Sequence, residues 1–218
     1  MIHKLEADSI LLTLNSREIL SSVYIKCETG KITGLLGRNG NGKSCLMNII
    51  YGTLNATTKS IRLDGTYLAN AYKNPDVLTY LSQTNFIPKQ LSIQRVFADY
   101  GIDYTGFENT FPEFKSKYNS QIKNLSGGEK RLVEIYLVLK SNSRFALLDE
   151  PFSMLSPISV EIVKELIKEV KSTKGILVTD HLFRSVIDIS DDIYVLSAGN
   201  TRLIKSLEEI EFLGYARI

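Results

Sequence analysis

The chain lacks any long apolar run and contains little cysteine. Its 218 residues include no stretch of about eighteen uninterrupted apolar residues, so the sequence predicts no membrane-spanning helix. The first residues, from Met1 to Glu6, lack the apolar core of a secretory signal, and we expect the chain to stay in the cytoplasm. The two cysteines, Cys27 and Cys45, are far apart, which excludes a paired zinc or redox motif and predicts two reduced thiols.

A strong charge of either sign is also absent. The formal net charge is +2 at pH 7 and no basic cluster stands out, so binding to nucleic acid is not expected. The sequence has no internal repeat, low-complexity tract or long Pro/Gly linker. With 44% hydrophobic residues, residues 1–218 are expected to form one globular domain.

A glycine-rich segment lies between an apolar run at residues 32–36 and a helical pattern at residues 45–51. Glycines keep side chains away from the loop, so successive N–H groups can converge on phosphates, and the following helix directs its positive end at the anion. This pattern predicts a phosphate-binding loop rather than a plain Gly/Asn turn. The candidate nucleotide-binding residues are Gly37, Arg38, Asn39, Gly40, Asn41, Gly42, Lys43, Ser44 and Cys45.

Four further segments follow in a fixed order. The first is Gln83, which comes after a strand-like run at residues 77–81, and the second is a helix that opens with Leu125-Ser126-Gly127-Gly128-Glu129. The third is an apolar run that ends in Asp149 and Glu150, and the fourth is His181, which follows another apolar run at residues 176–179. Together with the phosphate loop, these segments resemble the ABC-type ATPases over nearly the whole chain. From Leu125 to Glu134 and again from Leu147 to His181, including Asp-Glu-Pro-Phe and Pro-Ile-Ser-Val, the chain looks like the ATPase of lipopolysaccharide export and its relatives in branched-chain amino acid import.

The resemblance implies an α/β fold: a P-loop NTPase (ABC ATPase) core with an antiparallel β subdomain and a helical signature subdomain at about residues 84–140. Continuous apolar runs at residues 32–36, 77–81, 145–148, 175–179 and 193–196 predict parallel strands buried on both faces. Strands at residues 9–14, 23–27 and 60–63 would form the antiparallel part. Aromatic residues between Gln83 and Ser126 fit either packing of the helical subdomain or docking of a partner, and the sequence does not separate the two. These are Tyr100, Tyr104, Phe107, Phe111 and Phe114.

The resemblance also implies roles for site residues, with ATP and Mg²⁺ as cofactors. Ser44, Gln83 and Asp149 would serve the metal, Glu150 would act as general base toward water, and His181 would contact the γ-phosphate. We expect Asp149 and Glu150 to point to opposite sides because successive side chains alternate on a strand. Ser126, Gly127 and Gly128 would complete the ATP site of a second chain in a head-to-tail dimer. Glu129, Lys130 and Arg131 are interpreted as a mostly solvated helix face.

The chain departs from the family pattern at two positions. Ser156 stands where the family has an aspartate that links the two ATP sites; it would still cap the helix that begins at Pro157. Leu14 stands nearest to the position of the aromatic residue that stacks on adenine, while Tyr24 belongs to the next predicted strand. We therefore expect slower hydrolysis and poorer discrimination of ATP from GTP.

Three functions remain open from the sequence. The favoured one is the ATP-hydrolysing subunit of a transporter, with separate transmembrane subunits as partners. On ATP binding it would form a homodimer or pair with a paralogous cassette, on the cytoplasmic face of the inner or plasma membrane. The others are a soluble ABC-type ATPase of assembly or repair and a nucleotide-gated switch with little turnover, the last suggested by Ser156.

Overall fold

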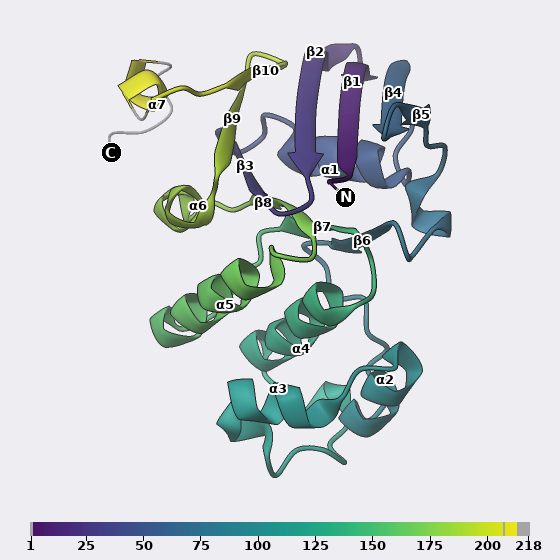
Figure 1. The fold of residues 1–218 in the computed structure, drawn as a ribbon, viewed down its shortest axis with the longest axis vertical. Helices are drawn as coiled ribbons and strands as arrows, with labels where there is room; N and C mark the ends of the chain where they lie inside the picture. The colour runs from purple at the N-terminus through teal and green to yellow at the C-terminus, as the bar shows by residue number, and fades with distance from the viewer. Residues whose placement is uncertain (1, 207, 213–218) are drawn as a thin grey trace.

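The computed structural model describes residues 2–206 and 208–212, so the last six residues of the expected domain, 213–218, lie outside it. Ten strands in the described part form one sheet in the order β5-β4-β1-β2-β10-β9-β3-β8-β7-β6 (Figure 1). The strands are β1 (Lys4–Leu14), β2 (Arg17–Glu28), β3 (Ile32–Leu36), β4 (Thr58–Leu63), β5 (Thr66–Tyr67), β6 (Leu78–Leu81), β7 (Phe145–Asp149), β8 (Gly175–Thr179), β9 (Asp192–Ser197) and β10 (Asn200–Leu203).

The helices follow the same chain order. They are α1 (Lys43–Tyr51), α2 (Ile93–Tyr100), α3 (Tyr104–Thr110), α4 (Gly127–Lys140), α5 (Pro157–Val170), α6 (Phe183–Ile189) and α7 (Glu208–Phe212), with 3₁₀ turns η1 (Ala71–Lys73), η2 (Pro112–Phe114) and η3 (Ile122–Asn124). Among the described residues, no helix combines the length and the apolar character needed to cross a membrane.

The parallel half of the sheet runs β9-β3-β8-β7-β6, and every adjacent pair in it is parallel. All residues of β3, β7 and β8 are buried, as expected for strands covered on both faces. Alternate residues of β7 enter different cores: Ala146 and Leu148 face one cluster, Phe145 and Leu147 the other. The predicted strands are confirmed, with bounds that agree at β3 and β8 and differ by one residue elsewhere.

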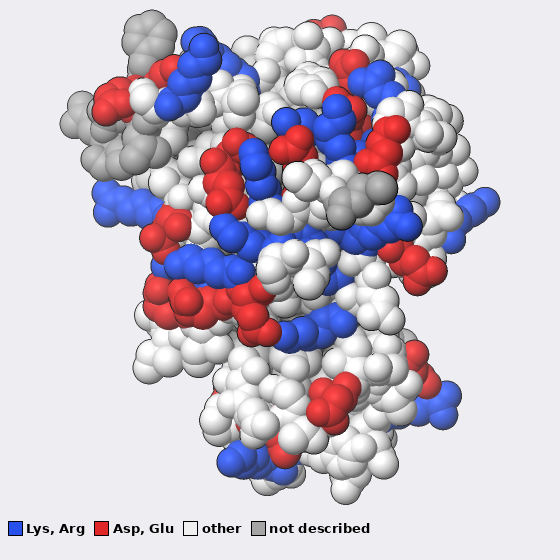
Figure 2. Space-filling view, in the orientation of Figure 1, with Lys and Arg blue, Asp and Glu red and all other residues white. Residues whose placement is uncertain are grey.

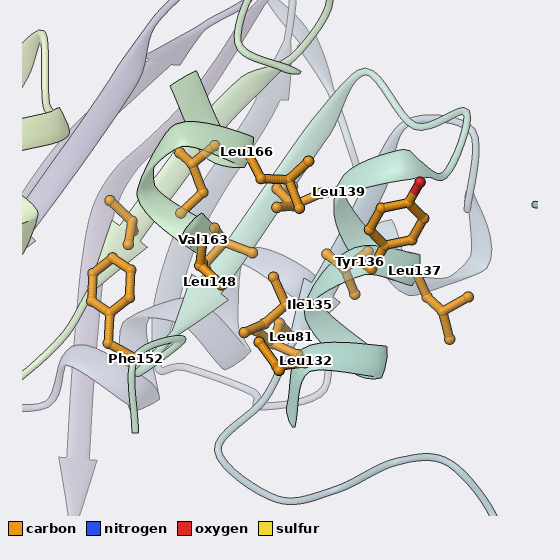
Figure 3. Close-up of a cluster of buried hydrophobic side chains, with 14 of the residues drawn as sticks. Leu81, Leu132, Ile135, Tyr136, Leu137, Leu139, Leu148, Phe152, Val163 and Leu166 are labelled. Carbon is orange, nitrogen blue, oxygen red and sulfur yellow. The ribbon is translucent and has the colours of Figure 1, made fainter. Parts of the chain in front are cut away.

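Helices α4 and α5 cover one face of this parallel half (Figure 1). In the close-up, Leu132, Ile135 and Leu139 of α4 lie against Leu81 and Leu148 of the sheet, and Val163 and Leu166 of α5 complete the layer (Figure 3). Helix α5 carries apolar residues at helical spacing and buries one stripe against the strands, whereas α4 is buried on nearly all sides from Arg131 to Leu139. The opposite face of the sheet packs on α1 and on the antiparallel strands.

The antiparallel part contains β1, β2, β4 and β5. The hairpin between β1 and β2 turns at Asn15 and Ser16, whose φ angles of 48° and 63° fit the tight turn that suits right-twisted strands. Both strands are longer than predicted, because their outward polar residues hide the continuation of the ladder. The short polar strand β10, which the sequence did not predict, joins β2 to β9.

The aromatic residues of the helical part are mainly core residues. Phe107, Phe111 and Phe114 are fully buried, and the ring of Phe107 lies 5.1 Å from that of Tyr136 on α4. The packing interpretation is therefore confirmed for these three phenylalanines. Tyr100, at the end of α2, remains 46% exposed.

Charged side chains of both signs intermingle over the face drawn in Figure 2. Ion pairs such as Lys31–Asp192, Lys164–Asp188 and Lys171–Asp191 join neighbouring elements of the fold. The half-exposed pairs Lys31–Asp192 and Lys171–Asp191 each contribute roughly 0–1 kcal/mol, whereas Lys164 is buried against the exposed Asp188. Because positive and negative side chains alternate there, that face has no extended electrostatic potential of a single sign.

Candidate functional site

The glycine-rich loop connects the carboxyl end of β3 to the first turn of α1. The helix begins at Lys43, and Gly42 caps it with a left-handed φ of 97° that disfavours a side chain. A Cβ atom at Gly42 would also lie 2.8 Å from Ile19 Cγ2. Both the backbone angle and the close packing therefore require glycine at this position.

Lys43 is folded back onto the loop. Its Nζ donates hydrogen bonds to the carbonyl oxygens of Gly37 at 2.6 Å and Arg38 at 3.4 Å, and its side chain is buried. Burial lowers the pKa of Lys43, an effect opposed by the charges of Glu150, Asp149 and Asp180. The ammonium group is thus held at the loop in the neighbourhood of three carboxylates.

A cavity of about 420 Å³ opens beside the loop. Among the predicted nucleotide-binding residues, Asn39, Gly40, Gly42, Lys43, Ser44 and Cys45 line it, together with Gln83 and Glu150. Gly37, Arg38 and Asn41 are not among its lining residues. Asn41 instead donates from Nδ2 to Leu196 O at 3.1 Å, which anchors the loop to β9.

The two adjacent carboxylates meet at one amide group. Gln83 Nε2 donates to Ser44 Oγ at 2.8 Å, Glu150 Oε1 at 3.2 Å and Asp149 Oδ1 at 3.4 Å. The expectation that Asp149 and Glu150 point to opposite sides of a strand is therefore wrong. Strand β7 ends at Asp149, and Glu150 has a left-handed φ of 51°, so strand alternation no longer applies to it. The structure thus brings Ser44, Gln83, Asp149 and Glu150 together.

Asp149 is almost completely buried, with 1% of its surface exposed. Burial raises the pKa of Asp149, because removal from water penalises the charged carboxylate, while hydrogen bonds from neighbouring side chains oppose the rise. One of those donors is Tyr80, whose hydroxyl lies 3.1 Å from Asp149 Oδ2. A buried carboxylate of this kind is suited to a cation.

His181 lies just beyond β8, next to the carboxylates. Its Nδ1 atom is 3.9 Å from Glu150 Oε2 and 3.2 Å from Asp180 Oδ1, and the side chain is 48% exposed. The Asp180 carboxylate is fully buried and accepts from the backbone N–H groups of Phe152 and Leu182, each at 2.9 Å. Asp180 therefore fixes the backbone on both sides of the site, and His181 projects from that fixed segment.

The predicted signature residues start helix α4. The Ser126 side chain accepts from Glu129 N, and the Glu129 carboxylate accepts in return from Ser126 N, so the two residues form a capping box. A Cβ atom at Gly128 would lie 2.8 Å from Met154 O, so this glycine also permits close packing within the chain. Ser126, Gly127 and Gly128 are not among the lining residues of the cavity beside the phosphate loop.

The interpretation of Arg131 as part of a solvated helix face is wrong. Only 1% of its surface is exposed, and its guanidinium donates to Ser82 O at 2.6 Å, Asp149 O at 2.6 Å and Glu150 O at 2.9 Å. Burial lowers the pKa of Arg131, and nearby carboxylates, first that of Glu134, oppose the change. Arg131 therefore fixes the backbone that carries both site carboxylates.

Glu134 is a second residue that the sequence analysis missed. It is buried one turn after Arg131, and its Oε1 accepts from Phe86 N at 2.8 Å while its Oε2 accepts from Asn85 Nδ2 at 2.9 Å. These bonds hold the segment that follows Gln83. A sequence signal did exist: two opposite charges one helical turn apart within an otherwise apolar run.

The region expected to hold the nucleotide base is aliphatic. Leu14 and Ile19, on either side of the first hairpin turn, line the cavity. Tyr24 lies on β2 as predicted, and its hydroxyl donates to Glu6 Oε1 at 2.8 Å. It is absent from the residues that line this cavity, so the aliphatic pair forms this wall.

Ser156 caps α5 as the sequence predicts. Its side chain accepts from Ser159 N at 3.2 Å, and Pro157 occupies the first helical position. The hydroxyl also lies 2.9 Å from Ser159 Oγ. Ser156 therefore preserves the cap without contributing a charge.

Comparison with known proteins agrees with this geometry. A family model described as ABC transporter matches residues 20–153. The chain belongs to the ABC transporter family. The lipopolysaccharide export system ATP-binding protein LptB of Haemophilus influenzae is 32% identical over 210 residues, covering 89% of this chain and 87% of that protein. LptB of Escherichia coli K12 is 29% identical over 216 residues, covering 90% and 88% respectively.

Solved structures have the same fold. The ATP-binding subunit of an ABC transporter superposes with a TM-score of 0.78 at 22% identity, covering 95% of this chain and 92% of that one. A bacterial Atm1-family ABC exporter with ATP bound gives 0.84 at 20% identity, covering 97% of this chain and 40% of the exporter. As an ABC-type ATPase, this chain binds ATP and hydrolyses it to ADP and phosphate.

Proposed function

We propose that this ATPase drives a transporter whose membrane-spanning part is made by separate subunits, and that it works on the cytoplasmic face of the membrane. Two relatives that match most of the chain are named ATP-binding proteins of the lipopolysaccharide export system. By analogy with them, the cargo class that we favour is an amphipathic lipid. The named site residues, the metal and the partner surfaces below belong to the same proposal.

The oxygen atoms of Ser44 and Asp149, with Gln83 beside them, fit Mg²⁺, which prefers oxygen ligands. They converge on the Gln83 amide group, and rotation of that amide would present its oxygen in place of its nitrogen. Within the described residues, no group of three or more His, Cys, Asp and Glu side chains could hold a metal. We therefore expect phosphate oxygens of ATP to supply further ligands. When bound, Mg²⁺ would neutralise charge on the phosphates.

The remaining side chains provide the other elements of hydrolysis. Glu150 lines the cavity and would orient or deprotonate the attacking water. Lys43 would exchange the carbonyl oxygens of Gly37 and Arg38 for phosphate oxygens, with its charge compensated by the anion. His181, 3.9 Å from Glu150, would donate to the γ-phosphate from the far side.

A second chain would complete each site. The N-terminus of α4, with Ser126, Gly127 and Gly128, is a natural anion site but does not line its own chain's cavity. The adjacent segment exposes apolar surface: Met154 is 64% exposed and Ile158 is 76% exposed. A head-to-tail pair of identical chains, or a pair with a paralogous cassette, would cover this surface and place the signature on the partner's nucleotide.

The membrane partner would dock in a groove on the other side of the Gln83 segment. The groove has a volume of about 500 Å³ and is lined in part by Tyr51, Tyr80, Ser82, Phe86 and Tyr100. Phe86 and Tyr100 are 36% and 46% exposed, which suits a short amphipathic segment of a membrane subunit.

The observation that carries the proposal is the position of the Gln83 segment. Gln83 contacts Ser44 and Glu150 in the nucleotide cavity, while its neighbours Ser82 and Phe86 line the groove. Movement of a partner in the groove would therefore displace the residue that touches the catalytic carboxylate. This is a direct mechanical route between ATP and a membrane subunit.

The first test is isolation of tagged Glu150→Gln chain from gently solubilised cells in the presence of ATP, followed by mass spectrometry. The expected companion is a multi-span membrane protein, and its identity would also test the lipid cargo. Tyr100→Glu should release that companion, because a charge would enter the groove, while the isolated chain keeps its ATPase activity. Recovery of soluble companions alone would contradict the transporter proposal and favour an assembly or repair ATPase.

A nucleotide-gated switch is the second candidate, favoured by Ser156. Its hydroxyl is engaged by Ser159 of the same chain, and it offers no charge to a partner site. Turnover of the native chain compared with Glu150→Gln separates the two candidates. Equally slow ATP turnover in the native chain and in Glu150→Gln, together with ATP-induced dimers, would support the switch. ATP turnover that is much lower in Glu150→Gln than in the native chain would support the transport ATPase.

A further inference from the structure

Tyr80 of β6 joins two parts of the molecule. Its hydroxyl approaches Asp149 Oδ2 at 3.1 Å, and its ring lines the groove beside Tyr51, with the two ring centroids 5.2 Å apart. The side chain is thus shared between the wall of the groove and the buried carboxylate that we assign to the metal.

The direction of the hydrogen bond follows from the surrounding groups. Asn48 Nδ2 lies 2.8 Å from the carbonyl oxygen of Ser44, which only accepts, and Asn48 Oδ1 accepts from Thr53 Oγ1 at 2.8 Å. The same Nδ2 donates to the Tyr80 oxygen at 3.2 Å. Because the tyrosine oxygen accepts from Asn48, its single proton is free to be donated to Asp149.

The two oxygens of Asp149 are therefore held by different donors. Gln83 Nε2 lies 3.4 Å from Oδ1, whereas Tyr80 holds Oδ2. The Gln83 contact is the longer of the two, and Gln83 shares its amide with Ser44 and Glu150. Without the tyrosine hydroxyl, Oδ2 would lose this hydrogen bond, and the carboxylate would keep the longer contact with Gln83 and its hydrogen bond with Ser44.

We propose that Tyr80 is a positioning residue that orients the Asp149 carboxylate for the metal. The proposal rests on the metal assignment made under the proposed function. Hydrogen-bonded neighbours of metal ligands fix the ligand's orientation, and their loss typically weakens metal binding by about 10–100-fold. Since Asp149 would be one ligand among several, we expect the low end of that range for removal of the Tyr80 hydroxyl.

The test measures metal binding rather than hydrolysis. Full-length chain is mixed with a non-hydrolysable ATP analogue below the protein concentration, and Mn²⁺ is titrated while the free-ion signal is followed by electron paramagnetic resonance. Tyr80→Phe should weaken Mn²⁺ binding about tenfold. Binding of a fluorescent ATP analogue in excess chelator, without metal, should stay within about twofold of the native value, because the ring and the nucleotide cavity are retained.

Tyr51→Phe is the matched control. It removes a hydroxyl from the same groove wall, and within the described residues that hydroxyl forms no hydrogen bond with a site residue. Its Mn²⁺ affinity should match that of the native chain. Equal Mn²⁺ affinities in Tyr80→Phe and the native chain would overturn the proposal. An equal loss of Mn²⁺ binding and of metal-free nucleotide binding, or failure of Tyr80→Phe to fold, would also overturn it, because either result indicates a purely structural role for the hydroxyl.

Asp149→Asn separates the two levels of the argument. If this variant loses Mn²⁺ binding while Tyr80→Phe binds normally, the metal assignment stands and the Tyr80 proposal fails alone. If Asp149→Asn binds Mn²⁺ as the native chain does, the metal assignment under the proposed function fails, and the Tyr80 proposal is overturned with it.

Discussion

Replacement of Arg131 by methionine tests the buried network that supports the site. The guanidinium donates to the carbonyl oxygens of Ser82, Asp149 and Glu150 and lies 3.8 Å from Glu134. Methionine keeps an unbranched apolar stem of similar length but supplies no donor and no charge. The perturbation therefore leaves three inward carbonyl groups and one buried carboxylate without their cation.

The magnitude follows from these contacts. A buried polar group that loses its partner costs about 1–3 kcal/mol, and the loss of one member of a buried ion pair typically costs about 3–5 kcal/mol. Some of the three carbonyl groups can recover a water molecule, so the sum is smaller than three full penalties. We expect Arg131→Met to lower the free energy of unfolding by about 3–5 kcal/mol, which corresponds to a fall in Tm of roughly 6–20 °C for a chain of this size.

Urea unfolding followed by circular dichroism measures the change. Lys130→Met is the matched control, because Lys130 is the neighbouring helix residue, is half-buried and forms no ion pair in the part of the chain that the structure describes; its effect should stay within about 0.5 kcal/mol. In a double-mutant cycle, Arg131→Met with Glu134→Gln should cost about 1–2 kcal/mol less than the two single changes added together. A cost for Arg131→Met below about 1 kcal/mol would refute the reasoning.

Three further predictions concern other parts of the molecule. Burial lowers the pKa of Lys174 from 10.5 to about 8, so between these two values the unfolded chain binds more protons than the folded chain and stability rises with pH. Relative to Lys174→Met, the native chain should gain about 2 kcal/mol in free energy of unfolding between pH 7.5 and pH 9.5, measured by urea unfolding. The same pH dependence in both chains would contradict the assignment to Lys174. Phe107→Ala should cost about 3–5 kcal/mol in the same assay, because the ring is fully buried, whereas a cost near zero would mean that the aromatic cluster is not a core. The cavity is lined by Leu14 and Ile19 and not by an aromatic ring that could stack on adenine, so kcat/KM for ATP should exceed that for GTP by less than about tenfold. Leu14→Tyr should increase this ratio, and a strong ATP preference in the native chain would contradict the prediction of weak base selectivity.

The sequence was most informative where both faces of an element are buried. The strands at residues 32–36 and 175–179 have the predicted bounds, because a strand covered on both sides is a largely apolar run; here Lys31 and Gly37 bound the first and Lys174 and Asp180 the second. Strands β1 and β2 were predicted too short, since one of their faces is partly exposed and their polar residues look like loop residues. Strand β10 was missed because its four residues carry almost no apolar signal.

Charged residues were harder to place than apolar ones. Arg131 follows Glu129 and Lys130 in the sequence, and all three have the composition of a solvated helix face. Helix α4 is nevertheless buried on nearly all sides from Arg131 to Leu139, so Arg131 faces the backbone of two other segments rather than water. Which way a long charged side chain points depends on what surrounds the helix, and that information is absent from the local sequence.

The sequence by itself determined the class of the protein, because the phosphate loop, the signature segment and the Asp-Glu pair depend on local spacing and on the turn between a strand and a helix. Only the tertiary structure decided how these pieces meet. It placed Asp149 and Glu150 on one amide of Gln83 through the left-handed backbone of Glu150, buried Arg131 and Glu134 beneath them, and set Tyr80 between the groove and Asp149. Such contacts join residues 18 to 69 positions apart, and their geometry follows from packing of the whole sheet and its helices rather than from any segment alone.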